Sequence, residues 1–188
     1  MTRIIAGAAG GTRLEVPKAG TRPTSDRVRE SLFASLEGEG LLDGAQVVDL
    51  YAGSGALGLE CASRGASRVE LVERSRQAAD VARRNVQAVR RALGRDAPSI
   101  TVHPVAVRSF LSRTSPGIDL ALIDPPYDLT DEELTADLVA LAPLLASDAV
   151  VVVERSSRSA APDWAAAGLT AWRDRTYGDT ALWWSDNS

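Results

Sequence analysis

Four consecutive residues near the middle of the chain, Asp124, Pro125, Pro126 and Tyr127, have the functional groups to hold a flat ligand. The prolines lack a backbone N–H and restrict their neighbours, so they end the apolar run 118–123 and fix the direction of the loop. The Asp124 side chain and the Pro125 carbonyl can each accept an N–H bond. Tyr127 can stack on a nucleic-acid base, a contact worth roughly 1 to 3 kcal/mol. A rigid loop without a ligand is the alternative interpretation.

Two acceptors in such a loop suit the transfer of a group to an exocyclic amino nitrogen of a base. The lone pair of that nitrogen is delocalised into the ring, and acceptors for its N–H groups orient the lone pair toward an electrophile. A preorganised near-attack geometry supplies at best about 7 to 11 kcal/mol. The chemistry needs neither a metal nor a covalent intermediate, although a base in folded nucleic acid must first be extruded.

A second constellation lies in the segment VVDLYAGSGALGLE, where Gly53, Gly55 and Gly58 have the spacing G-x-G-x-x-G between an expected strand and an expected helix. Such glycines let the backbone approach a ligand closely, and the helix start offers free N–H donors. Taken alone, the motif equally suits a dinucleotide. Asp49 before the loop disfavours a pyrophosphate and favours a cationic ligand such as S-adenosylmethionine. Glu73 can accept bonds from its ribose hydroxyls.

The elements that position these residues alternate along the chain. Strands are expected at 46–52, 67–73, 99–103, 118–126 and 148–154, and helices at 56–65, 75–94, 105–113 and 130–147. This alternation predicts a parallel sheet covered on both faces. A hairpin (3–16) and a helix (25–36) are expected before this part, and two strands that turn near Gly178 after it.

Composition limits the remaining possibilities. The chain has 188 residues, 45% of them apolar, which is enough for one domain with a small appendage. No uninterrupted apolar run is long enough to cross a membrane. The apolar segment near the N-terminus is too short for a secretory signal, so a cytoplasmic protein is expected. Cys61 is the single cysteine, so it forms no internal disulfide, and we interpret it as a buried thiol. Because the chain has only one cysteine and one histidine, His103, a zinc site built from several such residues is excluded. No metal is expected.

The motifs together resemble a known family. DLYAGSGALGLE resembles the cofactor loop of class I S-adenosylmethionine-dependent methyltransferases, and DPPY resembles the motif of those that methylate amino groups of bases. The order RIIAG, TRPTSDRVRESLF, DLYAGSGALGLECASRGA and DPPY is similar to the bacterial small-subunit (16S) ribosomal RNA guanine-N2 methyltransferases. The match runs from Arg3 to Trp184.

The resemblance implies an α/β, Rossmann-like fold. Its seven-stranded, mostly parallel sheet has an antiparallel last strand and helices on both faces, and is preceded by the hairpin and helix. Residues 1–36 would form an extension that contacts RNA and cofactor, and 37–188 the methyltransferase domain. The implied cofactor is S-adenosylmethionine, and the implied cofactor-binding residues are Thr24, Asp49, Ala52, Gly53, Gly55, Glu73, Ala106 and Asp124.

The implied reaction is methylation of the N2 amino group of one guanine in ribosomal RNA, within an assembling small subunit and by a monomer. The expected catalytic residues are Asp124, Pro125 and Tyr127, and the expected substrate-binding residues are Arg3, Arg13, Arg22, Arg27, Pro126 and Tyr127. Arginine forks suit phosphates, although surface arginines also serve solubility. Amino methylation of adenine or cytosine in DNA and a dinucleotide-binding or inactive module are the alternatives.

Departures from the family pattern affect these expectations, among them Asp128, which adds a negative charge directly after D-P-P-Y. The hairpin commonly carries R-G-R, where this chain has Gly10, Gly11 and Thr12. The family often has a polar residue before the alanine that follows the third strand of the sheet, where adenine is recognised. This chain has Val105 there, so contact with adenine is expected from the backbone or from packing.

Overall fold

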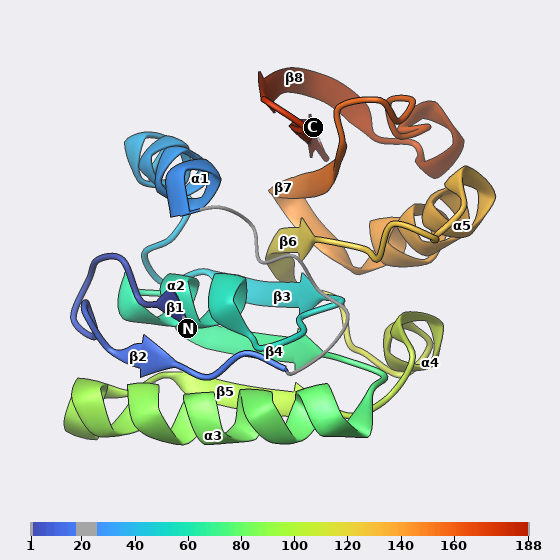
Figure 1. Cartoon of the computed structure of the whole chain (residues 1–188). Coiled ribbons are helices and arrows are strands. Elements are labelled where there is room, and N and C mark those ends of the chain that lie inside the picture. Colours follow the sequence, from blue (N-terminus) through green and yellow to red (C-terminus); the bar gives the residue numbers. More distant parts are fainter. Residues whose placement is uncertain (1, 18–25, 188) are drawn as a thin grey trace.

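The computed structural model describes residues 2–17 and 26–187, and its centre is a seven-stranded sheet with the order β5-β4-β3-β6-β7-β9-β8 (Figure 1). Its strands are β3 (Gln46–Leu50), β4 (Arg68–Val72), β5 (Ser99–His103), β6 (Ile118–Ile123), β7 (Leu145–Ser156), β8 (Thr170–Tyr177) and β9 (Thr180–Asp186). The first five are parallel, whereas β9 is antiparallel to both β7 and β8. The predicted sheet with an antiparallel last strand is confirmed.

Helices cover both faces of this sheet. They are α1 (Asp26–Gly38), α2 (Ala56–Ser63), α3 (Arg76–Leu93), α4 (Val107–Leu111) and α5 (Asp131–Leu141), with short 3-10 turns η1 (Gly94–Asp96), η2 (Ala142–Leu144) and η3 (Ala165–Ala167). The strands are apolar on both sides because each face has its own core. Val47, on β3, belongs to the core with α1, α2 and α3, and its neighbour Val48 belongs to the core with α4 and α5.

The strand order places a topological switch between β3 and β6. The chain passes outward from β3 to β4 and β5 and then returns to β6 on the other side of β3. In open α/β sheets, ligands bind outside the carboxyl ends of the strands at such a switch. Leu50 pairs with Ile123 in the last register position of the two strands, so the glycine loop and the D-P-P-Y loop leave the sheet side by side.

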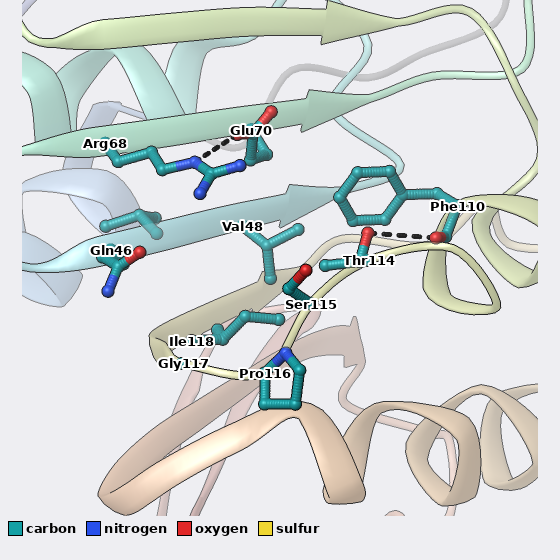
Figure 2. Close-up of a pocket in the computed structure, with 11 residues that line it drawn as sticks. Gln46, Val48, Arg68, Glu70, Phe110, Thr114, Ser115, Pro116, Gly117 and Ile118 are labelled. Carbon is teal, nitrogen blue, oxygen red and sulfur yellow. Dashed lines mark hydrogen bonds and ion pairs between the residues drawn. The ribbon is translucent and has the colours of Figure 1, made fainter.

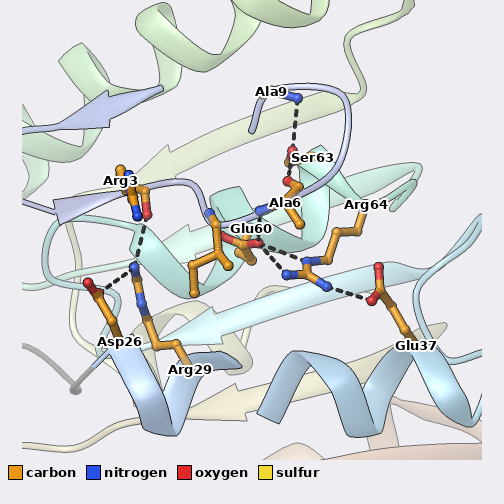
Figure 3. A network of polar contacts seen from close by, with 10 residues as sticks. Arg3, Ala6, Ala9, Asp26, Arg29, Glu37, Glu60, Ser63 and Arg64 are labelled. Carbon is orange, nitrogen blue, oxygen red and sulfur yellow. Dashed lines mark hydrogen bonds and ion pairs between the residues drawn. The ribbon is translucent and has the colours of Figure 1, made fainter. Parts of the chain in front are cut away.

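The N-terminal hairpin is fastened to α2 by buried polar contacts (Figure 3). Its strands β1 (Thr2–Arg3) and β2 (Arg13–Leu14) pair antiparallel. The fully buried Glu60 accepts hydrogen bonds from the backbone N–H groups of Ile5 and Ala6, at 2.7 and 3.0 Å. The Ser63 hydroxyl accepts from the N–H of Ala9 at 2.9 Å. These contacts therefore fix the hairpin to the second half of α2.

Some element boundaries differ from the predictions. The predicted helix 130–147 ends at Leu141, because Pro143 falls in the turn η2, and β7 starts at Leu145 instead of residue 148. The predicted strand 46–52 ends at Leu50, and Tyr51 takes a left-handed backbone with φ of 64°. The helix predicted at 105–113 is the shorter α4.

Candidate active site

A buried carboxylate lies under the glycine loop. Asp49, at the end of β3, is 1% exposed, and its Oδ2 accepts the N–H of Gly58 at 2.9 Å. Its Oδ1 is also buried and has no hydrogen-bond partner among the described residues. Burial raises the pKa of Asp49 to about 7, and the neighbouring carboxylates of Asp124 and Glu73 add to that rise. Three acidic side chains thus lie close together, and a cationic ligand would reduce the repulsion between their charges.

The loop itself is held by Glu73 at the end of β4. One Glu73 oxygen accepts the N–H of Gly53 at 3.0 Å, and the other accepts the N–H of Ser75 at 2.7 Å. Each carboxylate oxygen has a second lone pair, so Glu73 can still accept bonds from a diol. The N–H of Ala52 is bonded to the carbonyl of Val72 at 2.9 Å, which leaves the predicted role of Ala52 to its carbonyl or methyl group.

The glycines of the loop have two different uses. A Cβ on Gly58 would lie 2.4 Å from Leu71 Cδ2 and 3.2 Å from Asp49 Cβ, so this glycine lets α2 pack onto β3 and β4. Gly53 has φ of 56°, and a Cβ there would meet no atom within 4 Å. Open space above a left-handed glycine is where a ligand can approach the backbone.

The D-P-P-Y loop is tied at both ends and presents its aromatic ring outward. The N–H of Asp124 donates to the carbonyl of Leu50 at 3.4 Å. At the far end, Arg155 of β7 donates to the carbonyl of Leu129 at 3.2 Å. Pro125 is buried, whereas Tyr127 is 75% exposed. An exposed ring on such a loop can serve as a stacking platform. The start of the loop, Asp124, lies close enough to Asp49 to raise its pKa.

A cavity of about 320 Å³ opens between this loop, the end of β4, the start of α4 and α5. Ala106 and Pro126, both predicted as site residues, line it. Tyr51 and Asp137 also line it, and the Tyr51 hydroxyl donates to Asp137 Oδ2. Sequence reasoning missed this pair, although an acid on the apolar side of the α5 pattern was an available signal.

The predicted arginines Arg3, Arg13 and Arg27 do not line this cavity. Arg3 and Arg13 face each other in the hairpin register, and both are exposed, as is Arg27 on α1. The segment 18–25, with the predicted residues Arg22 and Thr24, lies outside the described residues.

A small hollow occurs at the opposite edge of the sheet, where strands begin (Figure 2). Its volume is about 30 Å³, close to the room of a single water molecule. Glu70 beside it bonds Arg68 Nε and His103 Nε2, each at 2.5 Å, and the His103 ring packs on Phe110. His103 is thereby held in a structural contact, as interpreted from the sequence.

Fold and site together define a class I S-adenosylmethionine-dependent methyltransferase. The family described as Conserved hypothetical protein 95 matches residues 2–185, and the chain belongs to it. Ribosomal RNA small subunit methyltransferase D of Escherichia coli (strain K12) is 35% identical over 161 residues, which are 85% of this chain and 77% of that protein.

Solved structures agree with this assignment. The protein yhhF of Escherichia coli superposes with a TM-score of 0.77 at 29% identity over 98% of this chain and 96% of its own. Magnesium protoporphyrin IX methyltransferase from Synechocystis PCC 6803, a structure with bound S-adenosylmethionine, has a TM-score of 0.68 at 16% identity and shares the fold over 86% of this chain and 79% of its own.

The residues present fit this cofactor. S-adenosylmethionine carries an ammonium and a sulfonium, and the unpartnered Oδ1 of Asp49 lies buried where acidic groups converge. When bound, the cofactor supplies an electrophilic methyl group. Among residues 2–17 and 26–187, no cluster of three acidic, histidine or cysteine side chains could hold a metal ion, and no helix is long and apolar enough to span a membrane.

Proposed function

We propose that the protein methylates the exocyclic N2 amino group of a specific guanine in small-subunit (16S) ribosomal RNA. The observation that carries the proposal is the adjacency of the D-P-P-Y loop and the acidic cofactor loop, fixed by the pairing of Leu50 with Ile123. The ribosomal RNA substrate of the Escherichia coli relative supports the choice of RNA and of the small subunit.

In this mechanism, Asp124 and the Pro125 carbonyl accept the two N–H groups of the guanine amine and aim its lone pair at the cofactor. Pro125 is buried and both loop ends are bonded, so these acceptors are preorganised and lose little entropy on binding. Tyr127 stacks on the extruded base, with Pro126 beside it at the cavity. No proton has to leave before the methyl group is transferred.

The charge distribution supports an RNA partner. The whole chain has a net charge of -4, yet residues 74–95 carry seven arginines, all exposed, and a single acid, Asp80. The end of β2 lies against α3 in the same region, where Arg84 pairs with Glu15 at 2.9 Å (Figure 1). The strand that carries Arg13 thus adjoins a basic helix, whereas the Arg3 carbonyl accepts a hydrogen bond from Arg29 of α1. We propose that Arg3, Arg13, Arg22 and Arg27 contact phosphates of a partly assembled small subunit, and that the enzyme acts as a monomer.

Transfer of a radioactive methyl group from S-adenosylmethionine tests the proposal. The substrates are naked 16S RNA, partly assembled small subunits and duplex DNA, and the product nucleoside is identified by mass spectrometry. We expect N2-methylguanosine in RNA and no label in DNA. Asp124→Ala should abolish transfer even at saturating cofactor, and Glu132→Ala, on the exposed side of α5, should retain transfer. Labelled adenine or cytosine in DNA, or unchanged turnover by Asp124→Ala, would refute the assignment.

A further inference from the structure

Asp137 is a buried acid in the wall of the site cavity. It lies on α5, is 3% exposed, and its Oδ2 accepts the hydroxyl of Tyr51. Its Oδ1 lies 4.0 Å from Arg108 Nε, which is beyond hydrogen-bonding distance. Burial also raises the pKa of Asp137. A buried carboxylate is costly unless its oxygens are satisfied, so an acceptor facing a cavity indicates a ligand with an N–H to donate.

The cavity has the volume and the position to hold the adenine ring. Its apolar wall comprises Val72, Ala106, Val107 and Pro126, which suits a flat heterocycle. Val72 directly precedes Glu73, the acid proposed to bind the ribose, so a base attached to that ribose reaches the cavity. The volume of about 320 Å³ is at the lower end of the roughly 300 to 1,000 Å³ of ligand pockets, which is enough for a purine.

We infer that Asp137, oriented by Tyr51, accepts a hydrogen bond from the 6-amino group of the cofactor's adenine. The residue before Ala106 is Val105, 37% exposed, which offers the amine no side-chain acceptor and leaves only backbone or packing contacts at that position. Helix α5 supplies that acceptor. The inference rests on S-adenosylmethionine as the cofactor and is independent of the RNA that is methylated.

An inosine analogue separates this role from mere packing. Hypoxanthine carries a carbonyl in place of the 6-amino group, and that oxygen would face the carboxylate lone pairs of Asp137. Sites built to bond an N–H reject analogues without it strongly. Isothermal titration calorimetry with S-adenosylhomocysteine and S-inosylhomocysteine should therefore give at least a tenfold preference of the wild-type protein for the adenosine compound.

The variant Asp137→Asn should reduce or reverse that preference. Its amide carbonyl can accept the Tyr51 hydroxyl, which leaves the amide N–H₂ to donate to the hypoxanthine oxygen. Glu133→Gln is the matched control, because Glu133 lines the same cavity but its carboxylate accepts the N–H of Thr130 at 2.9 Å. The control should keep the wild-type preference. Tyr51→Phe should reduce the preference, since it leaves Asp137 without its orienting donor.

The outcomes are distinct. Equal affinity of the wild-type protein for both compounds would overturn the inference, even if no variant folded. A full wild-type preference in a folded Asp137→Asn would place the recognition of the amine elsewhere and overturn it as well. Failure of the wild-type protein to bind either compound would refute the cofactor assignment itself.

Discussion

Replacing Asp49 by asparagine should stabilise the free protein while weakening cofactor binding. The rise in the pKa of Asp49 from 3.8 to about 7 means that ionising this side chain in the folded protein is unfavourable. At about 1.4 kcal/mol for each tenfold change in the ionisation constant, the rise corresponds to about 4 kcal/mol when Asp49 is charged. Asparagine can still accept the Gly58 N–H but gives a weaker bond, so we expect a net gain of about 1 to 3 kcal/mol at pH 8.

The stability gained by Asp49→Asn should depend on pH, because the pKa of Asp49 is raised in the folded protein. Because the folded-state pKa lies above the unfolded value, the folded protein holds the Asp49 proton more tightly, and this contribution to stability is present at low pH. It is lost as the pH rises from about 4 toward 7. The difference in unfolding free energy between Asp49→Asn and the wild type should therefore be near zero or negative at pH 4.5, increase with pH, and level off above about pH 7.5.

Urea unfolding at a series of pH values, followed by circular dichroism, measures this difference. Asp80→Asn is the control, because Asp80 is exposed on α3 and pairs with Arg83 at the surface. Its difference from the wild type should be small and nearly constant with pH. Saturating S-adenosylmethionine should stabilise the wild type more than Asp49→Asn. A pH-independent difference, or an asparagine variant that is less stable at pH 8, would refute the argument that a buried charge is held here for the cofactor.

Three further substitutions test the packing and the base site. Gly58→Ala should lower the free energy of unfolding by about 1 to 3 kcal/mol, because its Cβ would lie 2.4 Å from a buried Leu71 atom. Gly38→Ala is the control and should not destabilise, because its Cβ would lie in open space. Equal thermal midpoints for the two variants would contradict this prediction. Glu60→Gln should lower the free energy of unfolding by about 2 to 4 kcal/mol, since it places an amide N–H₂ against the hairpin N–H groups that the carboxylate accepts. An unchanged midpoint in thermal unfolding would show that these N–H groups have other partners. Tyr127→Ala should raise the KM for RNA about tenfold or more, and Tyr127→Phe should be mild in the same assay; a large loss with phenylalanine would mean that the hydroxyl, not stacking, binds the base.

The order of helices and strands could be predicted because the sheet is covered by a hydrophobic core on each face, which requires strands that are apolar on both sides. Residues 150–153 are all valine and all buried, and such a run occurs in strands covered on both faces. The start of α5 also follows a local pattern: Thr130 and Glu133 form a capping box, which depends only on residues three apart.

The walls of the site could not be predicted in the same way. Tyr51 contacts Asp137 across 86 residues, and that contact depends on how α5 returns along β6 after the D-P-P-Y loop. The attachment of the hairpin by Glu60 depends likewise on a separation of about 55 residues. Local patterns carry no information about such tertiary contacts. The roles predicted for Asp49, Glu73 and Asp124 stay predictions about function, although the structure brings the three acids together.

Mass-spectrometric mapping of 16S ribosomal RNA from cells with and without this protein tests the central claim most directly. Loss of the protein should remove one N2-methylguanosine from the small subunit, and every other methylated nucleotide should persist. The wild-type protein should restore that modification, and Asp124→Ala should not. An unchanged set of guanine methylations in the cells without the protein would contradict the account.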